Sequence, residues 1–159
     1  MKKEHVLDTI DLRILALLQK NARLPNAEIA RCLRMAPSAV FERLRKLEKS
    51  GVLQGFEPRI SPSALCSSLV AFIYVRADER VGSLEAGKLL AQIPEVQEVH
   101  CIAGEDRYLV KVRVAGTDAL AALLRDRIGT IRSVRSTRTT IGLTTLKETS
   151  QLPLTLPHD

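Results

Sequence analysis

The sequence predicts an α+β fold with two domains, an N-terminal winged helix-turn-helix followed by a ferredoxin-like β-α-β-β-α-β domain. Residues 8–50 carry apolar side chains at helical spacing with short polar breaks, whereas residues 68–146 alternate between strand-like and helical segments. Residues 57–66, EPRISPSALC, contain two prolines and predict a linker between these parts. The predicted domains are therefore residues 1–60 and 67–150, with a C-terminal tail at 151–159.

Three helices are predicted in the first domain. Asp8 is placed to cap the first helix, Pro25 stands near the start of the second, and Pro37 suits the first turn of the third. Gly51 is placed to end the third helix. The apolar positions that share one face are Ile10, Ile14, Leu17 and Leu18 in the first helix, Ile29, Ala30 and Leu33 in the second, and Val40, Leu44 and Leu47 in the third.

The outer face of the third helix combines basic and polar side chains, an arrangement that fits entry into the major groove of DNA. Residues 51–60, GVLQGFEPRI, predict two short strands around a turn, a wing beside this helix. The order of three helices and a hairpin favours DNA binding over an ordinary solvated helix face. The predicted DNA-binding residues are Ser38, Phe41, Glu42, Arg43, Arg45 and Lys46 on the helix and Arg59 at the edge of the wing.

The distribution of charge supports this prediction. The chain has a net charge of +6, and residues 1–60 hold 12 Lys or Arg against 7 Asp or Glu, whereas residues 61–159 hold 12 against 11. An excess of positive charge in the first third favours an anionic partner there, with nucleic acid foremost. No long apolar span or secretory signal is present, and the three cysteines lack metal-ligand spacing, so we expect a cytoplasmic protein without a membrane association, a metal or another cofactor.

The second domain reads as four strands and two helices. Strand-like segments lie at 68–77, 95–104, 107–116 and 131–146, and helical segments lie at 83–93 and 117–128, the latter opened by a Thr117 or Asp118 cap. In the first helical segment Leu84, Leu90 and Ile93 are roughly in line. The two helices are expected to cover one face of the sheet. The other face is left open, and a small sheet with an apolar open face usually dimerises through it, so we expect at least a homodimer.

The whole chain from residue 8 to residue 154 resembles the Lrp/AsnC family of bacterial and archaeal transcription regulators. The resemblance rests on LDTIDLRILALLQKNARLPNAEIA, APSAVFERLRKLEKSGVLQGF, AGEDRYLVKVRV and STRTTIGLTTLKE. It implies a double-stranded DNA partner, a small amino acid as effector, and dimers that assemble into tetramers or octamers. It also implies that the helix from Ser38 to Lys46 is the recognition helix.

The same resemblance implies an effector loop at CIAGEDRY. Where the family commonly has an acidic residue just before the aromatic one, this chain has Arg107. Glu105 or Asp106 could bind the ammonium group of an amino acid instead, or Arg107 could bind its carboxylate. A loop that makes only subunit contacts is the alternative. The candidate effector-binding residues are Cys101, Ala103, Gly104, Glu105, Asp106, Arg107 and Tyr108, together with Thr137 and Thr139 on the last strand.

Two other functions compete with a ligand-responsive regulator. A nucleoid-associated protein that binds DNA broadly without a ligand would share every feature above, with phosphate contacts from Arg43, Arg45, Lys46 and Arg59. The resemblance also extends to relatives that act as sirohaem decarboxylases, and an enzyme of that kind would use His100 and Arg107 near the loop to bind the carboxylates of a tetrapyrrole. A basic N-terminal helix has no purpose in such an enzyme, and the sequence contains no nucleophile elbow, phosphate loop or metal cluster. We therefore expect a regulator without enzymatic activity.

Overall fold

The computed structural model describes residues 6–155, which form two compact units. The first unit contains residues 6–58 together with 149–155, and the second contains residues 59–148. The chain therefore passes between the units twice, and the tail belongs to the same unit as the N-terminal helices.

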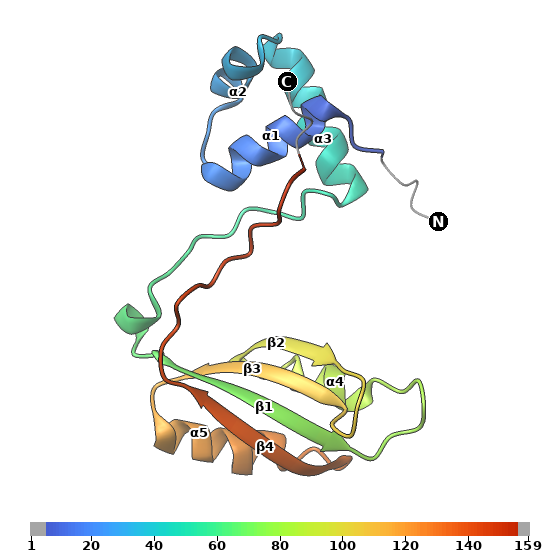
Figure 1. Ribbon diagram of the computed structural model, residues 1–159, viewed down its shortest axis with the longest axis vertical. Helices are drawn as coiled ribbons and strands as arrows, with labels where there is room; N and C mark the ends of the chain where they lie inside the picture. The colour runs from blue at the N-terminus through green and yellow to red at the C-terminus, as the bar shows by residue number, and fades with distance from the viewer. Residues whose placement is uncertain (1–5, 156–159) are drawn as a thin grey trace. The chain divides into compact units, whose positions relative to one another are not determined.

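Three helices make up the first unit: α1 (Thr9–Lys20), α2 (Asn26–Leu33) and α3 (Pro37–Ser50) (Figure 1). The α1 start is a capping box, in which Asp8 accepts a hydrogen bond from the Asp11 amide at 2.8 Å and the Asp11 side chain accepts one from the Asp8 amide. The core joins all three helices through Ile14, Leu18, Ile29, Ala30, Val40 and Leu47. The predicted helices, the Asp8 cap and the shared apolar face are confirmed.

The turn between α2 and α3 is tight. Arg34 ends α2 in the left-handed region with φ 54°, and the Met35 amide donates back to the Ala30 carbonyl at 2.9 Å. Pro37 then occupies the first turn of α3, and Gly51 ends that helix with φ 77°, as predicted. This turn fixes how α3 is presented beside α2.

The predicted wing strands are wrong. Residues 54–60 have no regular secondary structure, and the first strand of the described chain begins only at Leu69. Gly55 has φ 151°, and Pro58 has no amide hydrogen for a ladder hydrogen bond. Two short strands without a third to pair with are also barely stable by themselves. Part of the predicted linker forms a short 3₁₀ turn, η1 (Pro62–Leu65).

The second unit contains β1 (Leu69–Ala77), α4 (Glu85–Leu90), β2 (Val96–Cys101), β3 (Tyr108–Val114), α5 (Thr117–Leu123), η2 (Leu124–Ile128) and β4 (Val134–Gly142). The four strands form an antiparallel sheet with the order β2-β3-β1-β4, which is expected for a β-α-β-β-α-β chain. Figure 1 shows α4 and α5 beside the sheet.

Alternation along β3 divides the sheet into two faces. Tyr108, Val110, Val112 and Val114 are buried beneath the helices, as predicted from their period of two. Their neighbours Leu109, Lys111 and Arg113 lie on the opposite face, together with Phe72 of β1, which is 38% exposed. We call this second surface the open face.

The helices of this unit differ in detail from the prediction. Helix α4 is shorter than the predicted segment, and Leu84 precedes it with 47% of its surface exposed, whereas Leu90 and Ile93 are buried as expected. Gly116 occupies the cap position of α5 without a side-chain bond, so the predicted Thr117 or Asp118 cap is wrong. The helix continues through Ile128 as a π-helical turn, which keeps that side chain in the core.

Candidate DNA-binding surface and effector loop

The outer face of α3 is presented to solvent because Val40 and Leu47 hold the opposite side in the core. Arg45 has 71% of its side chain exposed, and its nearest acidic partner, Glu42, lies 4.0 Å away and is itself 57% exposed. A pair this open to water contributes little and leaves the guanidinium available to an anion. The exposed residues of this face are Ser38, Phe41, Glu42, Arg45 and Lys46.

Arg43 has a different environment from the rest of α3. Its Nη1 donates to Asp8 Oδ2 and to Asp11 Oδ1, each at 2.7 Å, and the Asp11 side chain is only 4% exposed. Hydrogen bonds and charge from both carboxylates raise the pKa of Arg43. The pKa of Asp8 is lowered, first by the hydrogen bond from the Asp11 amide and then by Arg43. Arg43 therefore joins α3 to the start of α1, and its role as a DNA contact stays a prediction.

Arg59 also has an intramolecular role. It belongs to the second unit, where its Nη2 donates to the Glu148 carbonyl oxygen at 3.0 Å. The role of Arg59 as a DNA contact stays a prediction. Arg34, which the sequence prediction omitted, is exposed in the turn directly before α3. A left-handed conformation at a non-glycine residue is the kind of signal that the sequence alone does not carry.

In the loop at 102–107, where the sequence predicts effector binding, two of the three charged side chains already have partners. Arg138 of β4 donates to Asp106 at 3.0 Å, and its guanidinium lies 4.1 Å from the centre of the Tyr74 ring. Arg107 donates from Nη2 to the Ser83 carbonyl at 2.7 Å. Glu105 is exposed and has no hydrogen bond or ion pair to any part of the chain that the structure describes. Glu105 is therefore the carboxylate of this loop that is open to a ligand.

Glu79 organises the base of the loop, and the sequence prediction missed it. Its side chain is 3% exposed, accepts a hydrogen bond from the Ala86 amide at 2.7 Å and accepts another from the Tyr108 hydroxyl at 2.6 Å. The Arg107 Nε lies 3.9 Å from the same carboxylate. Glu79 follows a strand as one of several acidic residues, and only the fold shows that it faces Tyr108.

These contacts shift two pKa values. Burial acts to raise the pKa of Glu79, but the hydrogen bonds from the Ala86 amide and Tyr108, with the charge of Arg107, outweigh it and hold that pKa below its usual range. Burial first, and then the bond to Glu79, raises the pKa of Tyr108. The loop base thus keeps a charged carboxylate beside a neutral phenol.

The remaining predicted effector residues lie on β2, on β4 and in the loop itself. Val75 of β1 pairs with Tyr108 on one side and with Thr137 on the other. The backbone of Thr137 is therefore two strand spacings, about 10 Å, from the backbone of Tyr108. Thr139 lies one row further along, opposite Ile73. Cys101 ends β2 opposite Tyr108, and Ala103 and Gly104 are exposed in the loop, with Gly104 at φ 137°.

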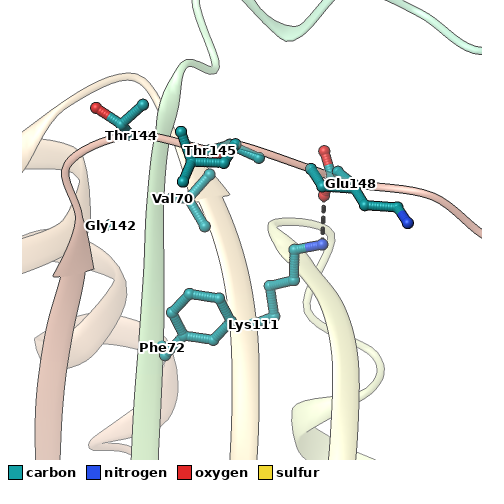
Figure 2. Close-up of a pocket in the computed structure, with 9 residues that line it drawn as sticks. Val70, Phe72, Lys111, Gly142, Thr144, Thr145 and Glu148 are labelled. Carbon is teal, nitrogen blue, oxygen red and sulfur yellow. Dashed lines mark hydrogen bonds and ion pairs between the residues drawn. The ribbon is translucent and has the colours of Figure 1, made fainter.

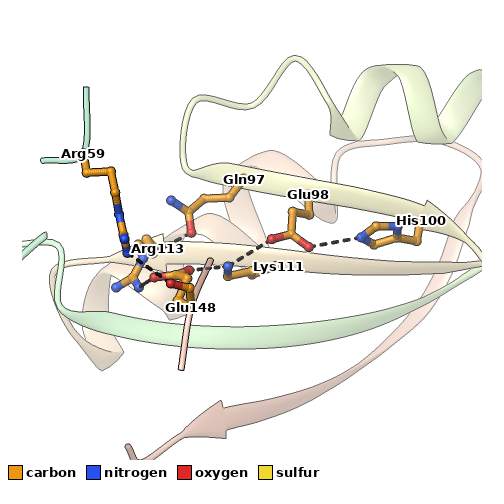
Figure 3. Close-up of polar contacts among 7 residues, drawn as sticks. All are labelled: Arg59, Gln97, Glu98, His100, Lys111, Arg113 and Glu148. Atoms are coloured by element: carbon orange, nitrogen blue, oxygen red, sulfur yellow. Dashed lines mark hydrogen bonds and ion pairs between the residues drawn. The ribbon is translucent and has the colours of Figure 1, made fainter. Parts of the chain in front are cut away.

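The open face carries a connected polar network (Figure 3). Lys111 forms ion pairs with Glu98 at 3.0 Å and with Glu148, and Arg113 donates to Glu148 at 2.6 Å. His100 contacts Glu98 at 3.1 Å. His100 and Arg107, the two residues of the alternative enzyme, therefore have separate partners.

The segment that follows β4 passes over the open face. Figure 2 shows Thr144, Thr145 and Glu148 above Phe72 and Lys111, around a pocket of about 320 Å³.

Within residues 6–155, no helix is both long and apolar enough to cross a membrane. The same residues contain no group of three or more His, Cys, Asp or Glu side chains arranged to hold a metal ion.

Known protein families match both parts of the chain. The model of a winged helix-turn-helix DNA-binding domain matches residues 7–54, and the model of the Lrp/AsnC ligand-binding domain matches residues 70–152. The HTH-type transcriptional regulator FL11 of Pyrococcus horikoshii is 40% identical over 148 residues, which are 93% of this chain and 97% of that protein. The leucine-responsive regulatory protein of Escherichia coli is 30% identical over 148 residues, 92% of this chain and 90% of its own length.

Solved structures agree over the full fold. Escherichia coli AsnC has a TM-score of 0.85 and 28% identity, covering 94% of this chain and all of that one. A feast or famine regulatory protein of Mycobacterium tuberculosis, complexed with L-methionine, has a TM-score of 0.85 and 37% identity, covering 96% of this chain and all of that one. A Neisseria meningitidis regulator in complex with L-methionine has a TM-score of 0.83 and 28% identity, covering 94% and 97%. The chain with the exposed basic α3 and the loop at 102–107 therefore belongs to the Lrp/AsnC family of DNA-binding transcription regulators.

Proposed function

We propose that the chain regulates transcription by placing α3 in the major groove, with a small amino acid as its effector. The observation that carries the DNA contact is the exposed face of Ser38, Phe41, Glu42, Arg45 and Lys46, which remains outside the helical core. Arg45 and Lys46 supply phosphate or guanine contacts, and Ser38 near the start of the helix suits a phosphate oxygen. Arg34 adds a cation in the preceding turn.

Fluorescence anisotropy tests the DNA contact. The purified chain is titrated against double-stranded DNA from upstream of its own gene and against random DNA, over a range of salt concentrations. Tighter binding to the upstream DNA supports a sequence-specific regulator. Equal binding to both supports the broad nucleoid-associated protein, and no binding at low salt contradicts both.

The effector proposal rests on Glu105, the one carboxylate of the loop that has no partner among residues 6–155. Asp106 is bound by Arg138 and Arg107 is bound to Ser83 and Glu79, so we assign the effector ammonium group to Glu105. Glu105 would then take the role of the acidic residue that the family commonly has just before the aromatic residue of the loop, where this chain has Arg107. The two relatives complexed with L-methionine make that amino acid the first probe.

Isothermal titration calorimetry with a panel of amino acids, L-methionine first, tests this assignment. The parent is expected to bind at least one amino acid, and Glu105→Gln is expected to lose that heat because the amide carries no charge for the ammonium group. Gln92→Ala, an exposed change at the end of α4, serves as the control. Unchanged binding by Glu105→Gln would place the ammonium group elsewhere.

The proposed assembly is a homodimer through the open face, with tetramers or octamers above it. Phe72 leaves apolar surface exposed there, and a two-fold axis would present two copies of α3 to a roughly palindromic DNA site. Sedimentation velocity measures the state directly. We place the protein in the cytoplasm with its DNA and assign it no enzymatic activity, since His100 lies on the open face beside Glu98 and not with Arg107.

A further inference from the structure

The segment that returns from the sheet to the helical unit has contacts at both of its ends. The chain passes from the first unit to the second at residues 58–59 and returns at 148–149. Arg59 and Glu148, the two residues of the second unit nearest these passages, are joined by the hydrogen bond from Arg59 to the Glu148 carbonyl oxygen. The two passages are thus held together at the edge of the second unit.

Glu148 is anchored on the sheet by its side chain. Its carboxylate binds Lys111 and Arg113, which are only 14% and 12% exposed (Figure 3). The hydrogen bond from Lys111 and then that from Arg113 lower the pKa of Glu148, so this group stays charged at neutral pH. Two largely covered cations on one carboxylate make this a stronger anchor than a single exposed surface pair.

The tail has a second anchor four residues further on, at Gln19 of α1. The Leu152 amide donates to Gln19 Oε1 at 2.7 Å, and Gln19 Nε2 donates to the Leu152 carbonyl at 3.1 Å. Gln151 Nε2 also donates to the Gln19 carbonyl at 2.6 Å. Two reciprocal hydrogen bonds with Leu152 and a third from Gln151 fix the tail on α1, whereas an untied terminal segment is usually poorly ordered.

Helix α1 is in turn bonded to α3. Asp8 and Asp11 at its start both accept hydrogen bonds from Arg43 of α3, and Asp11 is buried. The contacts of Lys111 and Arg113 within the second unit therefore end at Glu148, and those within the first unit run from the tail to α1 and α3. The covalent chain at residues 148–149 joins the two sets. Packed and hydrogen-bonded series of this kind can carry a coupling free energy between two sites.

We propose that residues 149–152 are a second connection through which the effector-binding unit controls the placement of the DNA-reading helices. In this arrangement the linker at 57–66 supplies reach, and the anchors at Glu148 and Gln19 restrict the motion that the linker would otherwise allow. The proposal rests on the proposed function, because it assigns the regulation of the same DNA-binding surface to the tail.

Distance measurement by electron paramagnetic resonance tests the restriction directly. The exposed residues Cys32, Cys66 and Cys101 are replaced by serine, and nitroxide labels are attached at Ala27→Cys on α2 and Lys88→Cys on α4, which are both exposed. Labelled chains are diluted with unlabelled ones so that distances within one chain dominate.

Two tail variants and one control are compared with this labelled parent. Gln19→Ala combined with Gln151→Ala removes the anchor on α1, and Glu148→Gln weakens the anchor on the sheet. Both are expected to broaden the distance distribution, whereas Gln92→Ala, which removes an exposed amide elsewhere, is expected to leave it unchanged. A parent distribution as broad as that of the tail variants overturns the proposal.

DNA binding supplies the second measurement. The tail variants are expected to lose about three- to tenfold in affinity for the upstream DNA and to keep their affinity for random DNA, because the surface of α3 is intact. Broader distances with unchanged preference for the upstream DNA overturn the coupling. If the parent itself shows no preference for any DNA, the proposed function fails, and the distance distributions still decide whether the tail restrains the two units.

Discussion

Replacing Arg43 is expected to destabilise the helical unit, although the residue stands on the helix that we assign to DNA. Arg43→Met keeps the aliphatic stem and removes the guanidinium that bonds to Asp8 and Asp11 at 2.7 Å each. Asp11, whose side chain is 4% exposed, then retains a buried charge without this partner. Breaking a fully buried ion pair on one side costs about 3–5 kcal/mol. Because Arg43 is 28% and Asp8 49% exposed, we expect about 2–3 kcal/mol here.

Hydrogen exchange followed by mass spectrometry measures this loss locally. A cost of about 2–3 kcal/mol corresponds to exchange roughly 30- to 150-fold faster in the peptides of α1 and α3 where opening of the unit limits exchange. Peptides from β1 and β3 are expected to be unaffected. Arg45→Ala, an exposed arginine two residues away, is the matched control and is expected to leave exchange unchanged. Equal exchange in Arg43→Met and Arg45→Ala would refute the structural role of Arg43.

Three further predictions address the DNA surface, the sheet core and the effector loop. Arg45→Ala is expected to weaken DNA binding and reduce the slope of log affinity against log salt by about one in anisotropy titrations, without changing sedimentation. Gly87→Ala is expected to destabilise the second unit by about 1–3 kcal/mol, seen as a lower urea midpoint in tyrosine fluorescence, because the added Cβ would lie 2.6 Å from Tyr108 Cε1. Arg107→Asp is expected to change which amino acids alter DNA binding, and an unchanged response across the panel would make this loop purely structural.

The pH dependence of the first unit follows from Asp8. Its pKa is lower in the folded chain than the ordinary value of 3.8, so its contribution to stability is fully present above that value and is lost as the pH falls through the lower folded pKa. Helical circular dichroism during an acid titration is expected to show an earlier loss in the parent than in Asp8→Asn, relative to each protein's stability at pH 7. Parallel titration curves would contradict this assignment.

Local sequence patterns predicted the helix ends correctly where a single residue type has a well-defined role in capping or turns. Asp8 begins α1, Pro37 begins α3 and Gly51 ends it because capping and turn geometry act within a few residues. The strands at 51–60 failed for the opposite reason. A strand needs a partner that local sequence does not specify, and Pro58 removes a donor that such pairing would require.

The sites were less predictable because they depend on side chains that are distant in the sequence. Helical spacing placed Arg43 at the flank of α3, and nothing local indicated that Asp8 and Asp11 would reach it. Glu79 was missed for the same reason, since its partner Tyr108 lies 29 residues away. Position on a helix predicts which face a residue occupies but not which charges from other elements meet it there.

Internal ion pairs explain how the charge asymmetry of the sequence becomes a usable surface. If the acidic residues of positions 1–60 were distributed evenly among the basic ones, they would offset the positive charge on every part of the surface. Instead, Asp8 and Asp11 are held by Arg43 on the flank of α3, away from Arg45. Carboxylates that are fixed in this way do not compete with an anionic partner for Arg45 and Lys46, so Glu42 is the acidic residue that remains beside these cations on the outer face. The ion pairs that join α1 to α3 thus also keep Asp8 and Asp11 away from the proposed DNA-binding surface.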